Sequence, residues 1–219
     1  MFDAKFMEIK TFYFNPIRVC CYVAWDQTKD CVIIDPGCYG EREFLRLKGF
    51  VEEKQLHPVR ILLTHGHFDH VFGLEDTARC WELDAWLHPA DREQLACSAA
   101  WCAELGLDFK PFTGRFLDLA DGQQLSFGHS SLRVIATPGH TQGGVCFFSE
   151  ADSVLFSGDT LFAGSIGRTD RPGGDYDQLM ESILQKLLPL DGDVTVLPGH
   201  GPATSIGCER ASNPFLQAD

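Results

Sequence analysis

THGHFDH, residues 64–70, places three histidines and one aspartate within seven residues. The stretch directly follows the apolar run 59–63, whose composition predicts a buried strand. Four side chains that can bind a metal ion therefore lie where the chain leaves the core. A histidine-rich surface turn would explain one stray histidine, but it does not explain this spacing directly after a buried strand.

Three further segments place a histidine or an aspartate beside glycine, just after an apolar run. They are TPGHT at 137–141, SGDT at 157–160 and LPGHG at 197–201. Glycine lets the backbone turn sharply and approach closely, as it must where loops converge on an ion. The four segments together offer five imidazoles and two carboxylates: His65, His67, Asp69, His70, His140, Asp159 and His200.

Seven ligands exceed the four that one tetrahedral ion takes, and they suit two ions that share a carboxylate and a water. The set therefore predicts a dinuclear site. Imidazole-rich ligation favours zinc, iron or manganese over calcium and magnesium but does not choose among the three. We expect two divalent ions, with zinc as the first expectation and iron or manganese as alternatives. The remaining histidines, His57, His88 and His129, lie at expected element boundaries or in a polar turn and are interpreted as structural or solvated.

The composition is that of a folded chain. Its 219 residues, 44% hydrophobic and 22% charged, predict a single domain over 1–219. The net charge of −13 argues against nucleic acid as a partner, because no basic run can follow a phosphate backbone. Nine cysteines without a CxxC pair or a signal-like segment favour reduced thiols in the cytoplasm. No stretch of about 18 apolar residues predicts a membrane span.

Predicted strands and helices alternate along the chain. Strands at 5–14, 17–25 and 31–35 form an antiparallel meander, and a helix follows at 40–54. Further helices are predicted at 74–83, at 89–105 and from Asp175, and further strands at 59–63, 123–127, 131–137, 144–149, 153–157 and 194–197. The tail after His200 is expected to be loosely structured. This order predicts an α/β sandwich of two β-rich halves with helices packed outside.

The four ligand segments, in this order, resemble those of the metallo-β-lactamase superfamily over about residues 12–202. GDTLF at 158–162 and SIGRTD at 165–170 look like the glyoxalase II group, especially its short bacterial members. The resemblance implies an αββα four-layer sandwich, two mixed sheets with helices outside. By position it also implies a first metal on His65, His67 and His140, a second on Asp69, His70 and His200, and Asp159 as the bridge.

The resemblance implies a metal-dependent hydrolase, a thioesterase acting on a substrate such as S-lactoylglutathione. Two cations lower the pKa of a bridging water from about 16 toward 7, so hydroxide is available at neutral pH to attack the acyl carbonyl. Asp69, both ligand and catalytic residue, is expected to orient that hydroxide. Arg168 matches a basic substrate-binding residue of the family and is expected to pair with a substrate carboxylate. Asp170 departs from the tyrosine of the larger enzymes.

The runner-up interpretation is a mono-iron persulfide dioxygenase on the same fold, which GRTD at 167–170 also resembles. Its iron would be held by His65, His140 and Asp159. A β-lactamase is less favoured, because such relatives commonly carry cysteine near the position of Asp159. A non-enzymatic metal-storing module would keep the ligands without turnover.

The expected partner is a small-molecule acyl or thioester substrate, with no nucleic acid and no membrane surface. The larger glyoxalase II enzymes hold glutathione partly through a C-terminal helical domain, whereas only 202–219 follow the last ligand here. The sequence therefore leaves the exact substrate open, and it does not predict the oligomeric state. Arg171, close to Arg168, is interpreted as a surface residue.

Overall fold

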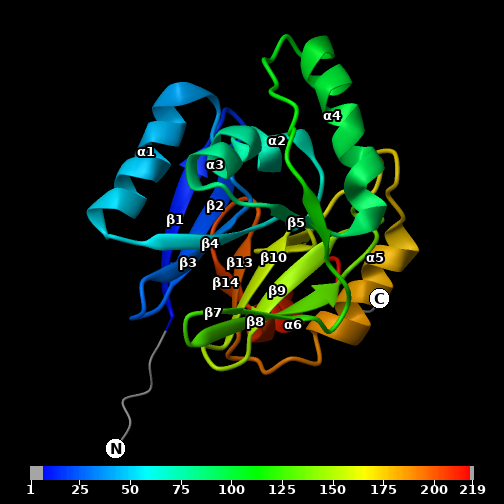
Figure 1. Ribbon diagram of the computed structural model, residues 1–219. Coiled ribbons are helices and arrows are strands. Elements are labelled where there is room, and N and C mark those ends of the chain that lie inside the picture. Colours follow the sequence, from blue (N-terminus) through cyan, green and yellow to red (C-terminus); the bar gives the residue numbers. More distant parts are fainter. Residues whose placement is uncertain (1–6, 218–219) are drawn as a thin grey trace, which may run out of the picture.

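The first of two large sheets is built from the N-terminal half of the chain (Figure 1). Its strands, in sheet order, are β1 (Glu8–Phe14), β2 (Val19–Trp25), β3 (Asp30–Ile34), β4 (His57–Leu62), β5 (Ala85–Leu87) and β6 (Phe116–Asp118). The computed structural model describes residues 7–217, so the predicted strand start at 5 and 6 lies outside the described residues. The antiparallel meander β1-β2-β3 is confirmed, and β3 to β6 run parallel, which makes the sheet mixed.

The second large sheet comes from the C-terminal half. In sheet order it contains β14 (Thr204–Ser205), β13 (Thr195–Pro198), β10 (Val154–Gly158), β9 (Val145–Ser149), β8 (Ser130–Ala136) and β7 (Gln124–Phe127). Within it, β10 and β13 pair in parallel and the other neighbours pair antiparallel, so this sheet is mixed as well. A ribbon of β11 (Leu161–Phe162) and β12 (Ser165–Ile166) follows β10.

Helices cover the outer faces of both sheets (Figure 1). On the side of the first sheet lie α1 (Gly40–Glu53), α2 (Phe68–Val71), α3 (Leu74–Trp81) and, after the 3-10 turn η1 (Pro89–Asp91), α4 (Arg92–Glu104). On the side of the second sheet lie α5 (Tyr176–Ser182), its π-helical continuation η2 (Ile183–Leu187) and α6 (Ile206–Ser212). The predicted cap of α5 is confirmed, since the Asp175 carboxylate accepts a hydrogen bond from the Gln178 N–H at 2.9 Å.

The alternation of side chains along β2 explains the layers. Tyr22 faces the second sheet, where it packs with Phe147 and Phe156, whereas Val23 faces outward in the cluster that includes Leu47 of α1. Successive residues of a strand point to opposite faces, so a strand buried throughout, as β2 is, must lie between two apolar layers. The predicted αββα sandwich is confirmed. All nine cysteines are free and most are buried.

The prediction of a loosely structured tail after His200 is wrong. This segment adds β14 to the second sheet and then forms α6, whose start is capped by the Ser205 hydroxyl oxygen accepting from the Cys208 N–H at 3.2 Å. Ile206 is buried in the outer cluster of the second sheet. The two-residue strand β14 and the seven-residue helix α6 are too short for strand or helix periodicity to show, and the three-residue strands β5 and β6 were missed for the same reason. No helix within residues 7–217 combines the length and hydrophobicity needed to cross a membrane.

Candidate metal centre

The segments that carry the seven predicted ligands meet at one end of the sandwich. The first sheet supplies its donors from the loop after β4 and from the short helix α2, which begins inside the THGHFDH stretch. The second sheet supplies its donors from the loops that follow β8, β10 and β13. The two contributions are His65, His67, Asp69 and His70 from the first sheet, and His140, Asp159 and His200 from the second.

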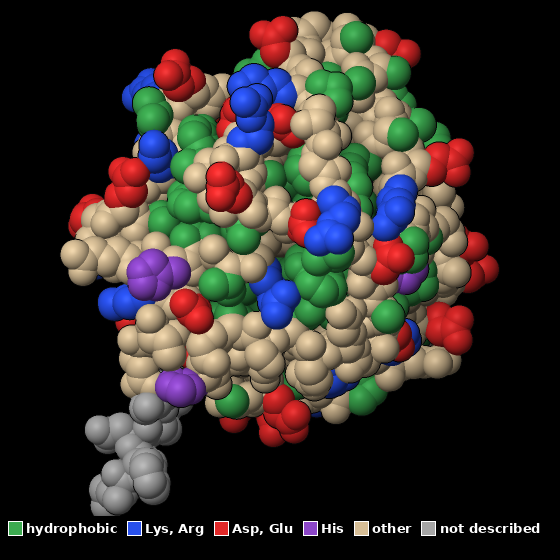
Figure 2. Space-filling view, in the orientation of Figure 1, with side chains coloured by type: hydrophobic (Ala, Val, Ile, Leu, Met, Phe, Trp, Pro, Cys, Tyr) green, Lys and Arg blue, Asp and Glu red, His purple; other side chains and the backbone are tan. Residues whose placement is uncertain are grey.

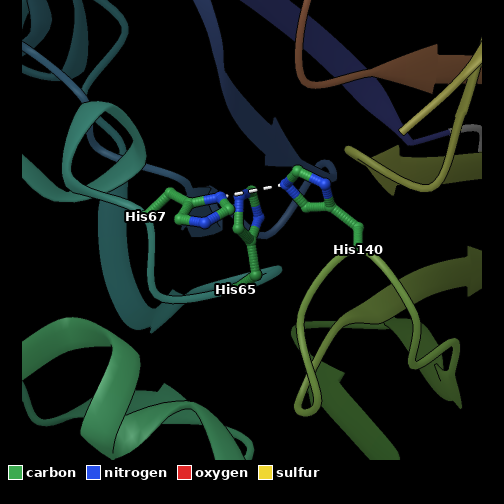
Figure 3. A group of neighbouring side chains, drawn as sticks. All are labelled: His65, His67 and His140. Atoms are coloured by element: carbon green, nitrogen blue, oxygen red, sulfur yellow. Dashed lines mark hydrogen bonds between the residues drawn. The ribbon is translucent and has the colours of Figure 1, made fainter. Parts of the chain in front are cut away.

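Their potential ligand atoms form three overlapping groups, in each of which all atoms lie within 4.8 Å of one another. Figure 3 shows the group in which His140 points across to His67, with its Nε2 at 2.9 Å from the His67 Nδ1, and His65 beside them. The other groups are Asp69, His70 and His200, and His65, His70 and Asp159.

Asp159 lies between the group of His65, His67 and His140 and the group of Asp69, His70 and His200. Its Oδ1 is 3.4 Å from the His70 Nε2, and its Oδ2 is 3.6 Å from the His140 Nε2 and 3.7 Å from the His200 Nε2. One carboxylate therefore faces imidazoles of both groups. This arrangement corresponds to the bridge that the family resemblance implies.

Hydrogen bonds fix which ring nitrogen carries the proton in the neutral form of three of the histidines. The His140 Nδ1–H donates to the Arg168 carbonyl at 2.7 Å. The His70 Nδ1–H donates to the Asp35 carboxylate at 2.9 Å, and the Thr64 hydroxyl donates to the same oxygen at 2.6 Å. Because the Thr64 proton is thus committed, its oxygen accepts from the His65 Nδ1–H at 3.0 Å. In its neutral form each of these three rings therefore directs an unprotonated Nε2 into the site, as metal ligands require.

The site contains buried polar atoms that a metal ion would satisfy. His65 Nε2, His70 Nε2 and Asp159 Oδ1 have no hydrogen-bond partner among the described residues. An unsatisfied buried polar group costs about 1–3 kcal/mol. These three atoms belong to residues of one group, and a cation with imidazole and carboxylate ligands would bind all of them. Because this group shares His65 with one of the other two groups and His70 with the other, the seven residues together are consistent with a dinuclear site.

Burial and neighbouring charge prepare the donors for a cation. Burial, together with the imidazoles of His70 and His67, holds the pKa of His65 well below its ordinary value, and burial with His140 lowers the pKa of His67 to about 3. Burial alone would raise the pKa of Asp159, but the imidazoles of His70, His65 and His140 hold it well below its usual range. Both imidazoles are thus neutral and the carboxylate is ionised at neutral pH, which are the forms that bind metal.

A cleft of about 590 Å³ opens onto the ligands. Trp101, Glu104 and Leu105, at the end of α4, form one wall, and the Trp101 ring lies 6.1 Å from the His67 ring between centroids. Arg168 and Arg171, in the loop after β12, also line the cleft. This volume is within the range of small-molecule sites, and the lining combines apolar surface with charge of both signs.

Arg168, the predicted substrate-binding residue, lines this cleft but already has a partner. Its Nε and Nη2 each lie 2.7 Å from one oxygen of the Asp170 carboxylate. This pairing holds the pKa of Asp170 at about 2. Asp170, the residue that departs from the tyrosine of the larger glyoxalase II enzymes, is therefore the ion-pair partner of Arg168, the residue that matches their basic position. Arg171, interpreted from the sequence as a surface residue, also lines the cleft.

Asp35 is a functional residue that was not predicted from the sequence; it is 1% exposed and orients His70 directly and His65 through Thr64. The available signal was its position immediately after a buried strand, because β3 and β4 are parallel and end at the same edge of the sheet. The three histidines interpreted as structural or solvated belong to none of the ligand groups within residues 7–217, and His57 is exposed. His88 caps η1 by accepting from the Ala90 N–H at 3.3 Å.

Comparison with known proteins gives the chain its family. The model of the metallo-beta-lactamase superfamily matches residues 15–200. Hydroxyacylglutathione hydrolase GloC of Haemophilus influenzae is 37% identical over 90% of this chain and 92% of that protein. The structure of TTHA1623 in a di-iron-bound form is 35% identical, with a TM-score of 0.85 over 94% of this chain and 100% of that one. BLEG-1 B3 metallo-beta-lactamase is 37% identical, with a TM-score of 0.85 over 96% and 100%. The chain therefore belongs to the metallo-beta-lactamase superfamily.

Proposed function

We propose that this protein is a metal-dependent hydrolase that cleaves a thioester such as S-lactoylglutathione. The observation that carries the proposal is the convergence of two ligand groups, with Asp159 between them, on the floor of one open cleft. Two divalent cations bound there would supply water activated at neutral pH and a Lewis acid for the acyl carbonyl. Zinc is the proposed metal, and the di-iron-bound form of TTHA1623 supports iron as the alternative.

Asp69 is the proposed catalytic residue. Its Oδ2 lies 3.1 Å from the His200 Nε2 and 3.7 Å from the His70 Nε2, and the residue lines the cleft. Burial alone would raise the pKa of Asp69, but the His70 imidazole and the hydrogen bond from His200 lower it by more, so the net shift is downward. An ionised carboxylate at this position can accept a hydrogen bond from the attacking water and hold it in line with the carbonyl.

The walls of the cleft suit a thioester that has both apolar and anionic parts. Trp101 and Leu105 offer apolar surface, while Arg168 and Arg171 offer guanidinium groups for carboxylates such as those of glutathione. The Arg168–Asp170 pair is solvent-exposed, and exposed ion pairs contribute little to stability. A substrate carboxylate can therefore replace Asp170 on Arg168. The similarity to GloC supports a hydroxyacylglutathione substrate.

β-Lactam hydrolysis is the second candidate. Similarity to BLEG-1 extends over the whole of that chain, and opening a lactam ring also requires attack of an activated water on a carbonyl carbon. The persulfide dioxygenase alternative explains fewer of the observed contacts. One iron on His65, His140 and Asp159 would leave the group of Asp69, His70 and His200 without a role.

The test is turnover by protein that has been stripped of metal and then loaded separately with zinc, iron and manganese. S-Lactoylglutathione, a chromogenic β-lactam and glutathione persulfide are offered in turn, the last with oxygen uptake recorded. We expect rapid S-lactoylglutathione hydrolysis that His140→Ala abolishes and that His57→Ala, at an exposed histidine, leaves unchanged. Turnover of the β-lactam alone, or oxygen uptake with one iron per chain, would refute the thioesterase proposal.

A further inference from the structure

Asp91 is a buried carboxylate that contacts two of the ligand loops. It ends η1, immediately before α4, and is 0% exposed. Its Oδ2 accepts from the Gly66 N–H and from the Thr141 hydroxyl, both at 2.8 Å, and its Oδ1 accepts from the Gly143 N–H at 2.5 Å. None of these donors is itself a predicted metal ligand, so the role of Asp91 concerns the backbone around the ligands.

The donors to Asp91 flank the histidines of one metal group. Gly66 lies between His65 and His67, and Thr141 directly follows His140. One loop follows β4 of the first sheet and the other follows β8 of the second. A single side chain, hydrogen-bonded to both loops, therefore sets the distance across which His67 and His140 face each other.

Close packing leaves the two loops little freedom around Asp91. A Cβ atom on Gly66 would lie 2.7 Å from the Asp91 carbonyl oxygen, and one on Gly143 would lie 2.7 Å from the Asp91 Oδ1. Glycine at both positions is what allows this approach. Ser98 of α4 adds a hydrogen bond to the Gly66 carbonyl at 3.3 Å, so the loop after β4 is held at both its N–H and its C=O groups.

The second metal group has separate support. Asp35 accepts from the His70 Nδ1–H, and the Asn15 amide donates to the Asp69 carbonyl at 2.8 Å. The hydrogen bonds of Asp91 reach neither α2 nor the loop after β13. Asp35 reaches both groups, His70 directly and His65 through Thr64, whereas Asp91 bonds only to the loops that carry His65, His67 and His140.

We infer that Asp91 is the positioning residue for the group of His65, His67 and His140, and that it sets the affinity of that group for its metal ion without touching the ion. This inference rests on the proposed metal centre and is independent of the substrate. Asp91→Asn tests it, because either orientation of the amide places an NH₂ group against the N–H of Gly66 or of Gly143. Loss of a hydrogen bond that supports metal ligands typically lowers metal affinity about 10- to 100-fold.

The two groups can be measured separately by zinc titration against a chelator. His200→Ala disables the second group and leaves the first, whereas His140→Ala does the reverse. We expect Asp91→Asn to weaken zinc binding at least about tenfold in the His200→Ala protein. In the His140→Ala protein we expect the affinity to stay within about twofold. An equal loss in both backgrounds would overturn the inference.

Asp26→Asn is the matched control. Asp26 is 1% exposed and accepts from the Thr28 and His129 N–H groups, so, like Asp91, it joins two loops. It lies far from the metal groups along β2, because it follows the last residue of that strand, whereas Val19, the first residue, pairs with His200. A loss of zinc affinity in Asp26→Asn equal to that in Asp91→Asn would show a general effect of destabilisation and overturn the inference.

Thr141→Val decides the question if Asp91→Asn does not fold. This variant removes one of the three donors to Asp91 and keeps the carboxylate. We expect a several-fold loss of zinc affinity confined to the His200→Ala background, and no loss would overturn the inference. Failure of the unsubstituted protein to bind zinc tightly at all would instead contradict the proposed metal centre, so the two failures are distinguishable.

Discussion

Replacing Asp35 by asparagine should change the protonated nitrogen of two metal-binding histidines at once. The Asp35 Oδ1 accepts from the Thr64 N–H at 2.8 Å, and the Oδ2 accepts from the Thr64 hydroxyl and from the His70 Nδ1–H. An asparagine that keeps the first bond presents NH₂ to the other two donors. His70 then accepts at Nδ1, and the Thr64 hydroxyl turns its proton to the His65 Nδ1. Both rings would carry the proton on Nε2, where the ion must bind.

The size of the effect follows from the two contacts. Zinc binding requires both protons to return to Nδ1, which leaves two buried donor-to-donor contacts at about 1–3 kcal/mol each. The expected loss is at least about 2 kcal/mol, or roughly 30-fold in zinc affinity. Zinc titration against a chelator measures this loss, and ¹⁵N spectra of the histidine rings in the zinc-loaded protein report which nitrogen is protonated.

Thr64→Val separates the two parts of the network. It removes the hydroxyl relay to His65 and leaves the Asp35–His70 hydrogen bond in place. Its loss of affinity should therefore be smaller than that of Asp35→Asn. Zinc affinity of Asp35→Asn within about threefold of the unsubstituted protein, with the ring protons unmoved, would refute the reasoning.

Three further outcomes are expected. Asp69→Ala should lower kcat for S-lactoylglutathione by at least about 100-fold at full metal occupancy, because it removes the carboxylate proposed to orient the attacking water. Metal analysis alongside the assay checks the occupancy. Full activity of the fully loaded variant would contradict the proposal. Asp170→Asn should free Arg168 and lower KM for this anionic substrate a few-fold with kcat unchanged, whereas KM for an uncharged thioester should not move. Burial raises the pKa of Asp26, but hydrogen bonds from Thr28, His129 and Ser130 lower it by more, so the net shift is downward. The ionised Asp26 therefore stabilises the folded state at any pH above the unfolded-state pKa of about 3.9. This contribution is lost as the pH falls through the pKa of Asp26 in the folded state. Asp26→Asn should accordingly lower the free energy of unfolding at pH 7, and denaturant titrations at decreasing pH should show the difference shrinking.

The ligand loops were predictable because each is a local signal. HxHxDH is contiguous, and each of the other ligands lies within four residues of the end of its own strand. Asp35 and Asp91 were not predictable in the same way, because they act through hydrogen bonds to residues 25 to 52 positions away in the sequence. In the sequence, Asp91 is only the residue after Pro89-Ala90 at a helix start, and its three donors are brought to it by the packing of the two sheets.

The layers were predictable for a similar reason, since a strand that is apolar throughout, such as β2, must be covered on both of its faces. Short elements such as β5 and α6 were not, because their place depends on the neighbours they pair with and not on their own pattern. The Arg168–Asp170 pair also depends on a loop conformation that spacing alone does not specify. Figure 2 shows acidic and basic side chains interspersed on the visible face, so net charge alone did not indicate where arginines gather at the cleft.

The division of the ligands between the two sheets links metal supply to resistance against unfolding. An ion on His65, His67 and His140 would contact a loop from each half of the chain, and it could not keep all three contacts once the sheets separate. Free metal at about 100 times its dissociation constant adds about 2.7 kcal/mol to the free energy of unfolding. A chelator should therefore lower the melting temperature while every apolar contact between the sheets remains, so that the ions act as a removable cross-link between the two halves.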